Sequence, residues 1–393
     1  MTSAATTTPE SPVAAPRPGS QIPALTGVRA LAAYLVFFHH APTPWLEPGP
    51  LQLWRELHIG VTLFFVLSGF VITWRYDRQE RRRESFLRGY FVNRFARIYP
   101  LYFFLVVPTM LLWGERSPRV WFFNLTIFSC FDSGIPQAWS LRVEECFYLA
   151  APLLFLLWRR NALLPLAAGA AALAALVPVS LLPSMDGILG PPRYLMLYTF
   201  FGRFFEFYVG IWLAERVAAG TAAASRARRV PVLTLVGGAG IFGVVAALAA
   251  IFAATKPRYM YGLYHPAGIA LNNFVLPVFV AVFYLGLIRE RSPAQRLFAT
   301  KAANLLGRSS YAFYLIHMGI LREYLARAVV VGGALVSARA EAAATGFVTS
   351  TAGLFVLVNV AAIGLYKGVE APANRYLRRR FASPASAPQP ALS

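Results

Sequence analysis

The sequence has few charged residues, and the acidic ones are fewer than the basic ones. Only 14% of its 393 residues are charged, and only 17 are Asp or Glu, whereas soluble domains are nearer one quarter charged. The two cysteines, Cys130 and Cys146, have neither metal-ligand spacing nor a disulfide framework, and both stand in or beside apolar runs. We interpret them as structural. The first 20 residues lack the apolar core of a secretory signal.

Apolar residues make up 57% of the chain. A membrane-spanning helix needs about 20 mostly apolar residues, and many windows meet that length. The sequence therefore predicts an all-α, polytopic membrane protein of about ten transmembrane helices. The expected spans are 24–43, 57–76, 98–114, 139–158, 162–183, 196–215, 230–254, 267–288, 305–325 and 346–366. A shorter apolar segment at 120–131 is interpreted as interfacial or re-entrant.

Basic residues occur in alternate loops and give the formal net charge of +20. With ten spans, the arginine-rich segments all fall on one side, and the loops 44–56 and 115–138 on the other side are nearly neutral. The positive-inside rule then predicts that both termini are cytoplasmic and that the chain lies in the plasma (inner) membrane. This pattern favours lipid over nucleic acid as the partner. Residues 1–20 and 382–393 are expected to be disordered tails around a membrane domain at 21–381.

Arg29 and His40 are the first candidates for function, because ionisable groups inside a membrane are costly. They are eleven residues apart, which puts them on one helical face about 16 Å apart along the axis. His40 could serve as a general base. The alternative is that it only caps the helix end and contacts water.

A second cluster follows in the segment that begins with Trp139 and Ser140. Glu144 is expected near the depth of His40, where a carboxylate would orient the imidazole. It could instead pair with Arg142 or cap its helix. Ser68, beside a glycine, indicates either close helix packing or a polar contact to a ligand.

Arg94 and Arg97 lie one helical turn apart at the rim of a span. Arginine binds phosphate through fork-shaped contacts, so the pair predicts a phosphate site. The alternative is that the two arginines only mark the cytoplasmic side of the membrane, as the positive-inside rule describes.

Other polar residues carry less weight. His317 is expected in the outer half of its span. Arg203 and Glu206, one turn apart, are interpreted as a structural ion pair. His58 and His265 are interpreted as span-end residues without a specific role.

These motifs occur in an order that resembles the acyltransferase-3 family of integral membrane O-acyltransferases. The matching residues are Arg29 and His40; Phe64 to Phe70; Arg94, Arg97, Tyr99 and Pro100; Trp139, Ser140, Leu141, Glu144, Phe147 and Tyr148; and Ser310, Tyr311, Tyr314, Leu315 and His317. The sequence departs from the family pattern at Cys146, where Gln is frequent, and at Arg142, where a small residue is frequent.

The resemblance implies transfer of an acetyl or other short acyl group from acyl-CoA to a hydroxyl, without a metal. Acceptors in the family include cell-envelope glycans, peptidoglycan sugars and glycosylated metabolites such as macrolides. His40 would be the catalytic base, with Glu144 as its partner. Arg29, Arg94 and Arg97 would hold the donor. The Ala- and Arg-rich composition favours a bacterial source.

The remaining motif residues are also assigned places in the expected reaction. Ser68 is expected at the donor, and His317, Trp139, Ser140 and Tyr311 at the substrate or the oxyanion. Transfer could be direct or could pass through a covalent acyl-enzyme. A transporter or flippase using the same buried charges as a substrate path is the main alternative, although no internal repeat is visible. A non-catalytic scaffold would be expected to lack the Arg29 and His40 pair.

Overall fold

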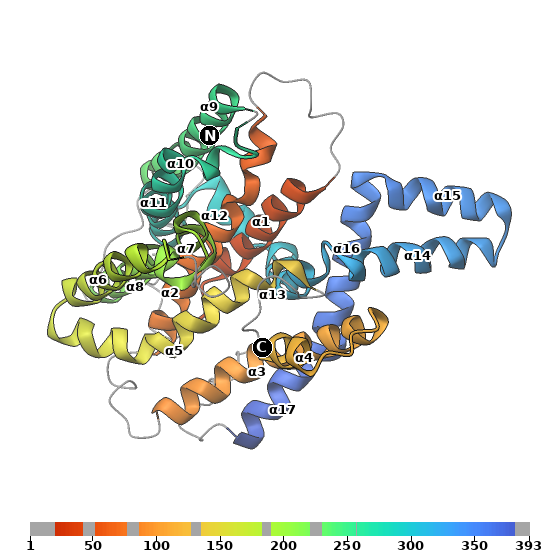
Figure 1. Ribbon diagram of the computed structural model, residues 1–393, viewed down its shortest axis with the longest axis horizontal. Coiled ribbons are helices and arrows are strands. Elements are labelled where there is room, and N and C mark those ends of the chain that lie inside the picture. The colour runs from red at the N-terminus through yellow and green to blue at the C-terminus, as the bar shows by residue number, and fades with distance from the viewer. Residues whose placement is uncertain are drawn as a thin grey trace, which may run out of the picture.

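The computed structural model describes residues 20–41, 52–76, 86–126, 135–182, 190–220, 230–256 and 258–381. Over these ranges the chain forms helices and connecting loops, with no strand, as Figure 1 shows. Both expected tails (apart from Ser20), Cys130, and most of the arginines of the 75–97 and 226–229 segments lie outside the described residues.

The N-terminal half contains six α-helices and two short 3-10 helices among the described residues. They are α1 (Pro23–His40), η2 (Leu53–Ile59), α2 (Gly60–Arg75), α3 (Phe86–Leu112), α4 (Pro118–Leu125), η4 (Pro136–Ala138), α5 (Trp139–Arg160) and α6 (Leu163–Val179). Proline in the first turn of α1 and α4 suits a helix start, because its fixed φ is helical and no amide hydrogen bond is lost there.

The described residues of the C-terminal half are also helical. Its elements are α7 (Pro192–Tyr198), α8 (Phe200–Gly220), α9 (Val232–Thr255), η6 (Gly262–Tyr264), α10 (Pro266–Ala270), η7 (Leu271–Val275), α11 (Leu276–Arg289), α12 (Pro293–Ala299), α13 (Lys301–Ile316), α14 (Ile320–Ala334), α15 (Ala338–Thr349), α16 (Thr351–Leu365), η8 (Tyr366–Glu370) and α17 (Ala371–Phe381). Both η7 and η8 are π-helical.

The centre of the molecule is built on α1 and α2. Helix α1 packs against α2 and α13, and α2 packs against α8. The α2–α8 contact depends on glycine: a Cβ on Gly69 would lie 2.3 Å from the Phe207 carbonyl oxygen, and one on Gly210 would lie 2.2 Å from that of Val66. Close helix packing therefore explains the glycine that follows Ser68.

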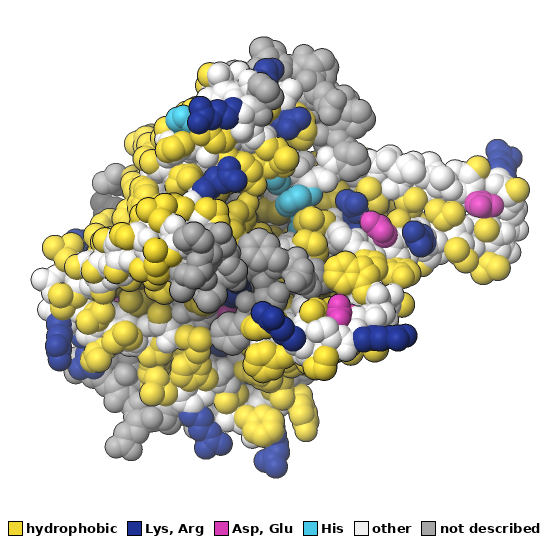
Figure 2. Space-filling view, in the orientation of Figure 1, with side chains coloured by type: hydrophobic (Ala, Val, Ile, Leu, Met, Phe, Trp, Pro, Cys, Tyr) yellow, Lys and Arg dark blue, Asp and Glu magenta, His cyan; other side chains and the backbone are white. Residues whose placement is uncertain are grey.

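Within the ranges that the structure describes, five helical segments are long and apolar enough to cross a membrane: 53–75, 86–112, 232–255, 266–289 and 351–381. Helix α6 is apolar but shorter. Hydrophobic side chains cover much of the face in Figure 2, as expected of a surface that contacts lipid rather than water. The all-helical membrane class is thus supported, whereas the count of ten spans and the direction of the termini stay predictions.

The structure corrects the expected span at 305–325. Helix α13 ends at Ile316, and Gly319 takes a φ of 75°, a left-handed conformation that suits glycine. The chain then forms a hairpin of α14 and α15 that projects from the body (Figure 1). The expected span at 98–114 also starts earlier, at Phe86. The expected span omits the first turns of α3 because their arginines lower the hydropathy. Arginine is nevertheless a good helix former, so the helix includes those turns.

Candidate functional site

Two pockets meet in the centre of the described chain. The histidine pocket, of about 250 Å³, is lined by His39, His40, His58 and Arg203 together with Val36, Val61, Pro136, Gln137, Trp139, Leu197, Tyr198, Tyr261, Leu263, Tyr264, Tyr314 and Met318. The arginine pocket, of about 80 Å³, is lined by Arg29, Arg94, Arg97 and Glu144 together with Val61, Phe64, Phe65, Ser68, Ile98, Ser140, Leu141, Tyr148, Ser310, Tyr311 and Tyr314.

Only Val61 and Tyr314 line both pockets. Helix α1 runs along the pair, with Arg29 in the arginine pocket and His40 at its last turn in the histidine pocket. The two pockets are therefore adjacent, and these two residues stand at their common border. We call these two residues the junction.

The hydrogen bonds of His40 define which of its nitrogens is free. Its Nδ1 lies 2.9 Å from the Val36 carbonyl oxygen and 3.4 Å from Nε2 of His317. A carbonyl can only accept, so we assign the His40 proton to Nδ1. His317 is fixed in the same way, because its own Nδ1 lies 2.7 Å from the Tyr314 carbonyl oxygen. His40 Nε2 makes no hydrogen bond to a described residue and keeps its lone pair.

This geometry changes the expected partner of His40. Glu144 lines the arginine pocket, where its carboxylate accepts hydrogen bonds from the hydroxyls of Ser68 and Tyr148. Among the described residues, the hydrogen bonds of Glu144 thus run to Ser68 and Tyr148 and not to His40, so its expected role toward His40 stays a prediction. From Trp139 in the histidine pocket to Glu144 the helix rises about 7–8 Å, which carries the carboxylate into the neighbouring pocket. Val36 and His317 hold the imidazole instead.

The three arginines of the arginine pocket differ in their partners. Arg97 is paired with the carboxylate of Glu370, which is 1% exposed. Arg29 and Arg94 make no hydrogen bond to a described residue, and Nε of Arg94 is buried without a partner. Arg94 lies over the ring of Tyr148, 5.4 Å from its centre. Both guanidinium groups lie in the field of the Glu144 carboxylate in the same pocket, and their hydrogen-bond donors remain open to a further anion.

The other sequence candidates divide between the pockets. Trp139 lines the histidine pocket and packs edge-on against Tyr198, with ring centres 4.9 Å apart. Ser140 and Tyr311 line the arginine pocket. The Ser140 hydroxyl lies 2.8 Å from that of Tyr314, and the Tyr311 hydroxyl donates to the Ile98 carbonyl oxygen at 3.0 Å. His317 is 1% exposed and stands behind His40 rather than in the pocket lining.

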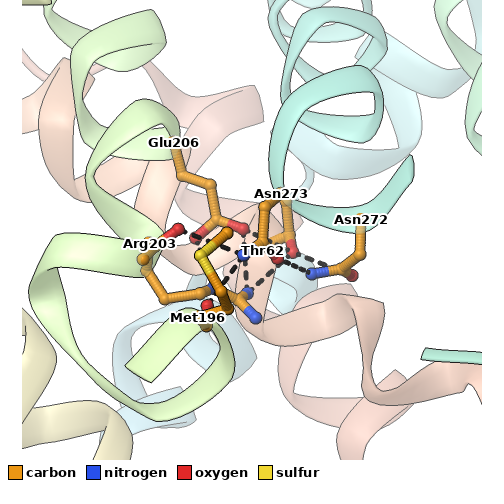
Figure 3. A network of polar contacts seen from close by, with 7 residues as sticks. Thr62, Met196, Arg203, Glu206, Asn272 and Asn273 are labelled. Carbon is orange, nitrogen blue, oxygen red and sulfur yellow. Dashed lines mark hydrogen bonds and ion pairs between the residues drawn. The ribbon is translucent and has the colours of Figure 1, made fainter. Parts of the chain in front are cut away.

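A buried polar network supports one wall of the histidine pocket (Figure 3). Arg203 pairs with Glu206 at 2.8 Å, which confirms the expected ion pair. It also donates to the Thr62 hydroxyl at 3.0 Å, and that hydroxyl donates to Glu206. Asn272 and Asn273, on the π-helical turn, continue the network. Because Arg203 also lines the pocket, the ion pair fixes the position of a guanidinium group in the site while Glu206 balances its charge.

Sequence reasoning missed several residues of the histidine pocket. Tyr198, Tyr261 and Tyr264 add aromatic rings, and burial raises the pKa of Tyr261, which keeps its hydroxyl neutral. His58, set aside as a span-end residue, also lines the pocket. These residues come from separate loops and short helices, so no local spacing in the sequence connects them. In the ranges that the structure describes, no set of three His, Cys, Asp or Glu could hold a metal ion.

The helical architecture with one arginine-lined and one histidine-lined pocket defines a membrane protein with a candidate group-transfer site. Residues 22–366 match the family described as "Acyltransferase domain" (Acyl_transf_3). The chain belongs to this family, as its motifs predicted.

Curated relatives are consistent with this assignment. The peptidoglycan O-acetyltransferase OatA of Listeria monocytogenes is 28% identical over 76% of this chain and 49% of its own length, so the chain spans about half of that relative. The acyltransferase MdmB of Streptomyces mycarofaciens is 29% identical over 94% of this chain and 96% of its own length. No solved structure matches the chain.

Proposed function

We propose that this protein transfers a short acyl group from acyl-CoA to a hydroxyl of a sugar-containing acceptor. The observation that carries the proposal is the pair of adjacent pockets that share Val61 and Tyr314 in their linings. One offers free guanidinium groups, and the other offers a free imidazole nitrogen among aromatic rings. A two-substrate transfer reaction needs such a pair of sites with one point of contact.

The arginine pocket suits the donor. Coenzyme A is polyanionic, and Arg29 and Arg94 have no hydrogen-bonding partner among the described residues. Arg97 is tied to Glu370, so we assign it the lesser part in donor binding. The pantetheine arm would run along α1 toward the junction, which puts the thioester carbonyl between Val61 and Tyr314.

The histidine pocket suits the acceptor. In the proposed step, Nε2 of His40 takes the proton from an acceptor hydroxyl while the hydroxyl oxygen attacks the thioester carbonyl. The tetrahedral intermediate then expels the coenzyme A thiolate, which takes the proton back from the His40 imidazolium. The Nδ1–H bonds to Val36 and His317 hold the ring for both transfers. The Tyr314 hydroxyl, which bonds to that of Ser140 at the border of the two pockets, would donate to the developing oxyanion.

The acceptor class rests on the pocket and on the relatives. Aromatic rings such as Trp139 and Tyr264 pack well against the apolar faces of sugar rings, and the polar groups between them bind hydroxyls. One relative is named for peptidoglycan. A cell-envelope glycan or a glycosylated metabolite such as a macrolide fits this chemistry. We further propose a bacterial plasma membrane location with both termini cytoplasmic.

The deciding experiment is a membrane assay of thiol release from acetyl-CoA against a panel of glycans and macrolides. Acceptor-dependent release, lost in His40→Ala, supports the function. Absence of release with any short acyl-CoA, together with passage of an acceptor across vesicles, would favour a transporter instead. Incubation with labelled acetyl-CoA alone separates the two chemical routes, since a stable label on the protein indicates a covalent acyl-enzyme.

A further inference from the structure

The histidine pocket contains a second imidazole that the proposed transfer step does not use. His58 stands on η2, directly before α2, and its side chain is 14% exposed. Its Nε2 lies 2.8 Å from Oε2 of Glu56. A carboxylate paired with an imidazole fixes the orientation of the ring and its tautomer. The carboxylate–imidazole pair that the sequence predicts for Glu144 and His40 is found at Glu56 and His58.

Glu56 is a costly residue in this position. It is 0% exposed, and a buried carboxylate is tolerated only when it is fully hydrogen-bonded. Its Oε1 accepts from the Gly262 amide at 2.7 Å, and its Oε2 is taken by His58. Oε1 thus ties η2 to Gly262 at the start of η6, whereas Oε2 holds the His58 ring within η2 and leaves Nδ1 without a hydrogen-bond partner among the described residues.

The free nitrogen of His58 faces away from Glu56. The two nitrogens of an imidazole point in widely different directions, so the bond through Nε2 leaves Nδ1 directed away from Glu56, on a ring that lines the histidine pocket. Nδ1 makes no hydrogen bond to a described residue. The ring is held by its neighbours: His39 packs edge-on at 5.5 Å between centres, and Tyr261 lies at 6.4 Å.

We propose that His58 is an acceptor-binding residue, with Glu56 as the positioning residue that aims it. Nδ1 accepts a hydrogen bond from a hydroxyl of the acceptor sugar next to the one that reacts at His40. A polyhydroxylated ring can engage both imidazoles at once, because both line the same pocket and His39 packs against each of them. A donor molecule in the arginine pocket would not meet His58. This inference rests on the proposed function for the identity of the acceptor.

The test uses two variants that separate the ring nitrogens. In His58→Gln the amide reaches the Nε2 position and keeps the Glu56 contact but leaves nothing at Nδ1. In His58→Asn the amide occupies the Nδ1 position but does not reach Glu56. The full-length protein in detergent is titrated with a soluble N-acetylglucosamine oligosaccharide and with a macrolide bearing a free sugar hydroxyl, without any donor. Steady-state acceptor KM, acetyl-CoA KM and kcat are then measured with whichever probe binds.

We expect His58→Gln to weaken acceptor binding and raise acceptor KM by about five- to tenfold, the effect of one lost hydrogen bond. Its kcat, its acetyl-CoA KM and its thermal stability stay near wild type. His58→Asn keeps acceptor affinity within about twofold but lowers thermal stability, because Glu56 loses its partner.

Three results overturn the inference: unchanged acceptor affinity in His58→Gln, a kcat loss of the size expected for a general base, or failure of the wild type to bind either probe. Because binding is measured without donor, these results are distinct from the failure of the proposed function. That failure would appear as wild-type protein that binds a probe yet releases no thiol.

Discussion

The junction between the two pockets makes a prediction about acyl chain length. Val61 and Tyr314 line both pockets, so in the proposed reaction the acyl group of the donor sits against Val61. Substitution Val61→Ala removes two carbon atoms from that wall. The space is then sufficient for an acyl chain two methylenes longer than acetyl.

The size of the effect follows from apolar burial. Each buried methylene contributes about 0.8 kcal/mol, so two contribute roughly 1.6 kcal/mol. Since about 1.36 kcal/mol is a factor of ten in rate, the ratio of kcat/KM for butanoyl-CoA over acetyl-CoA should rise by up to roughly 15-fold. Propionyl-CoA should gain about fourfold by the same arithmetic.

The assay is thiol release with the three thioesters at a fixed acceptor concentration. Val66→Ala is the matched control, because Val66 is on the same helix, is fully buried, and lines neither pocket. It should lower stability and leave the chain-length ratio unchanged. An equal ratio in Val61→Ala and wild type, or the same shift in both variants, would refute the assignment of the junction to the acyl group.

Three further predictions test separate parts of the site. His40→Ala should lower kcat by about 10²–10⁴-fold without loss of membrane insertion, and detergent-extracted protein of normal yield with full turnover would contradict the role. Arg94→Gln should raise acyl-CoA KM by roughly 10–100-fold, the worth of a charge-assisted hydrogen bond, measured against an unchanged acceptor KM. Glu206→Gln should destabilise the protein by about 3–5 kcal/mol, because it leaves the Arg203 charge buried without its partner; an unchanged midpoint in a thermal-melt assay would show that Arg203 is solvated.

The arrangement along a single helix could be predicted from the sequence. The spacing of Arg29 and His40 fixes their separation on an α-helix whatever the rest of the fold does, and the structure gives each its own pocket. The apolar runs likewise predicted most helices, because burial in lipid leaves the backbone no other way to satisfy its hydrogen bonds.

Contacts between helices were harder to predict. Glu144 was placed by depth alone, but its carboxylate is used by Ser68 and Tyr148, and only the direction and packing of α5 decide that. The break after Ile316 was hidden because apolar residues continue across Gly319, so hydropathy does not register it. Glu56 and His58 are only two residues apart, but the sequence does not show that the ring lines the pocket beside His40, because tertiary packing brings η2 and η6 together.

The near-complete separation of the two pocket linings determines how each product would inhibit the reaction. With the proposed assignment, free coenzyme A competes with acyl-CoA at the arginines, and the acylated product competes with the acceptor among the aromatic rings. Neither product occupies the other substrate's place, since only Val61 and Tyr314 are common to both. The turnover rate would then depend on the cell's ratio of acyl-CoA to coenzyme A through the arginine pocket. It would depend separately on the supply of acceptor and the removal of product through the histidine pocket.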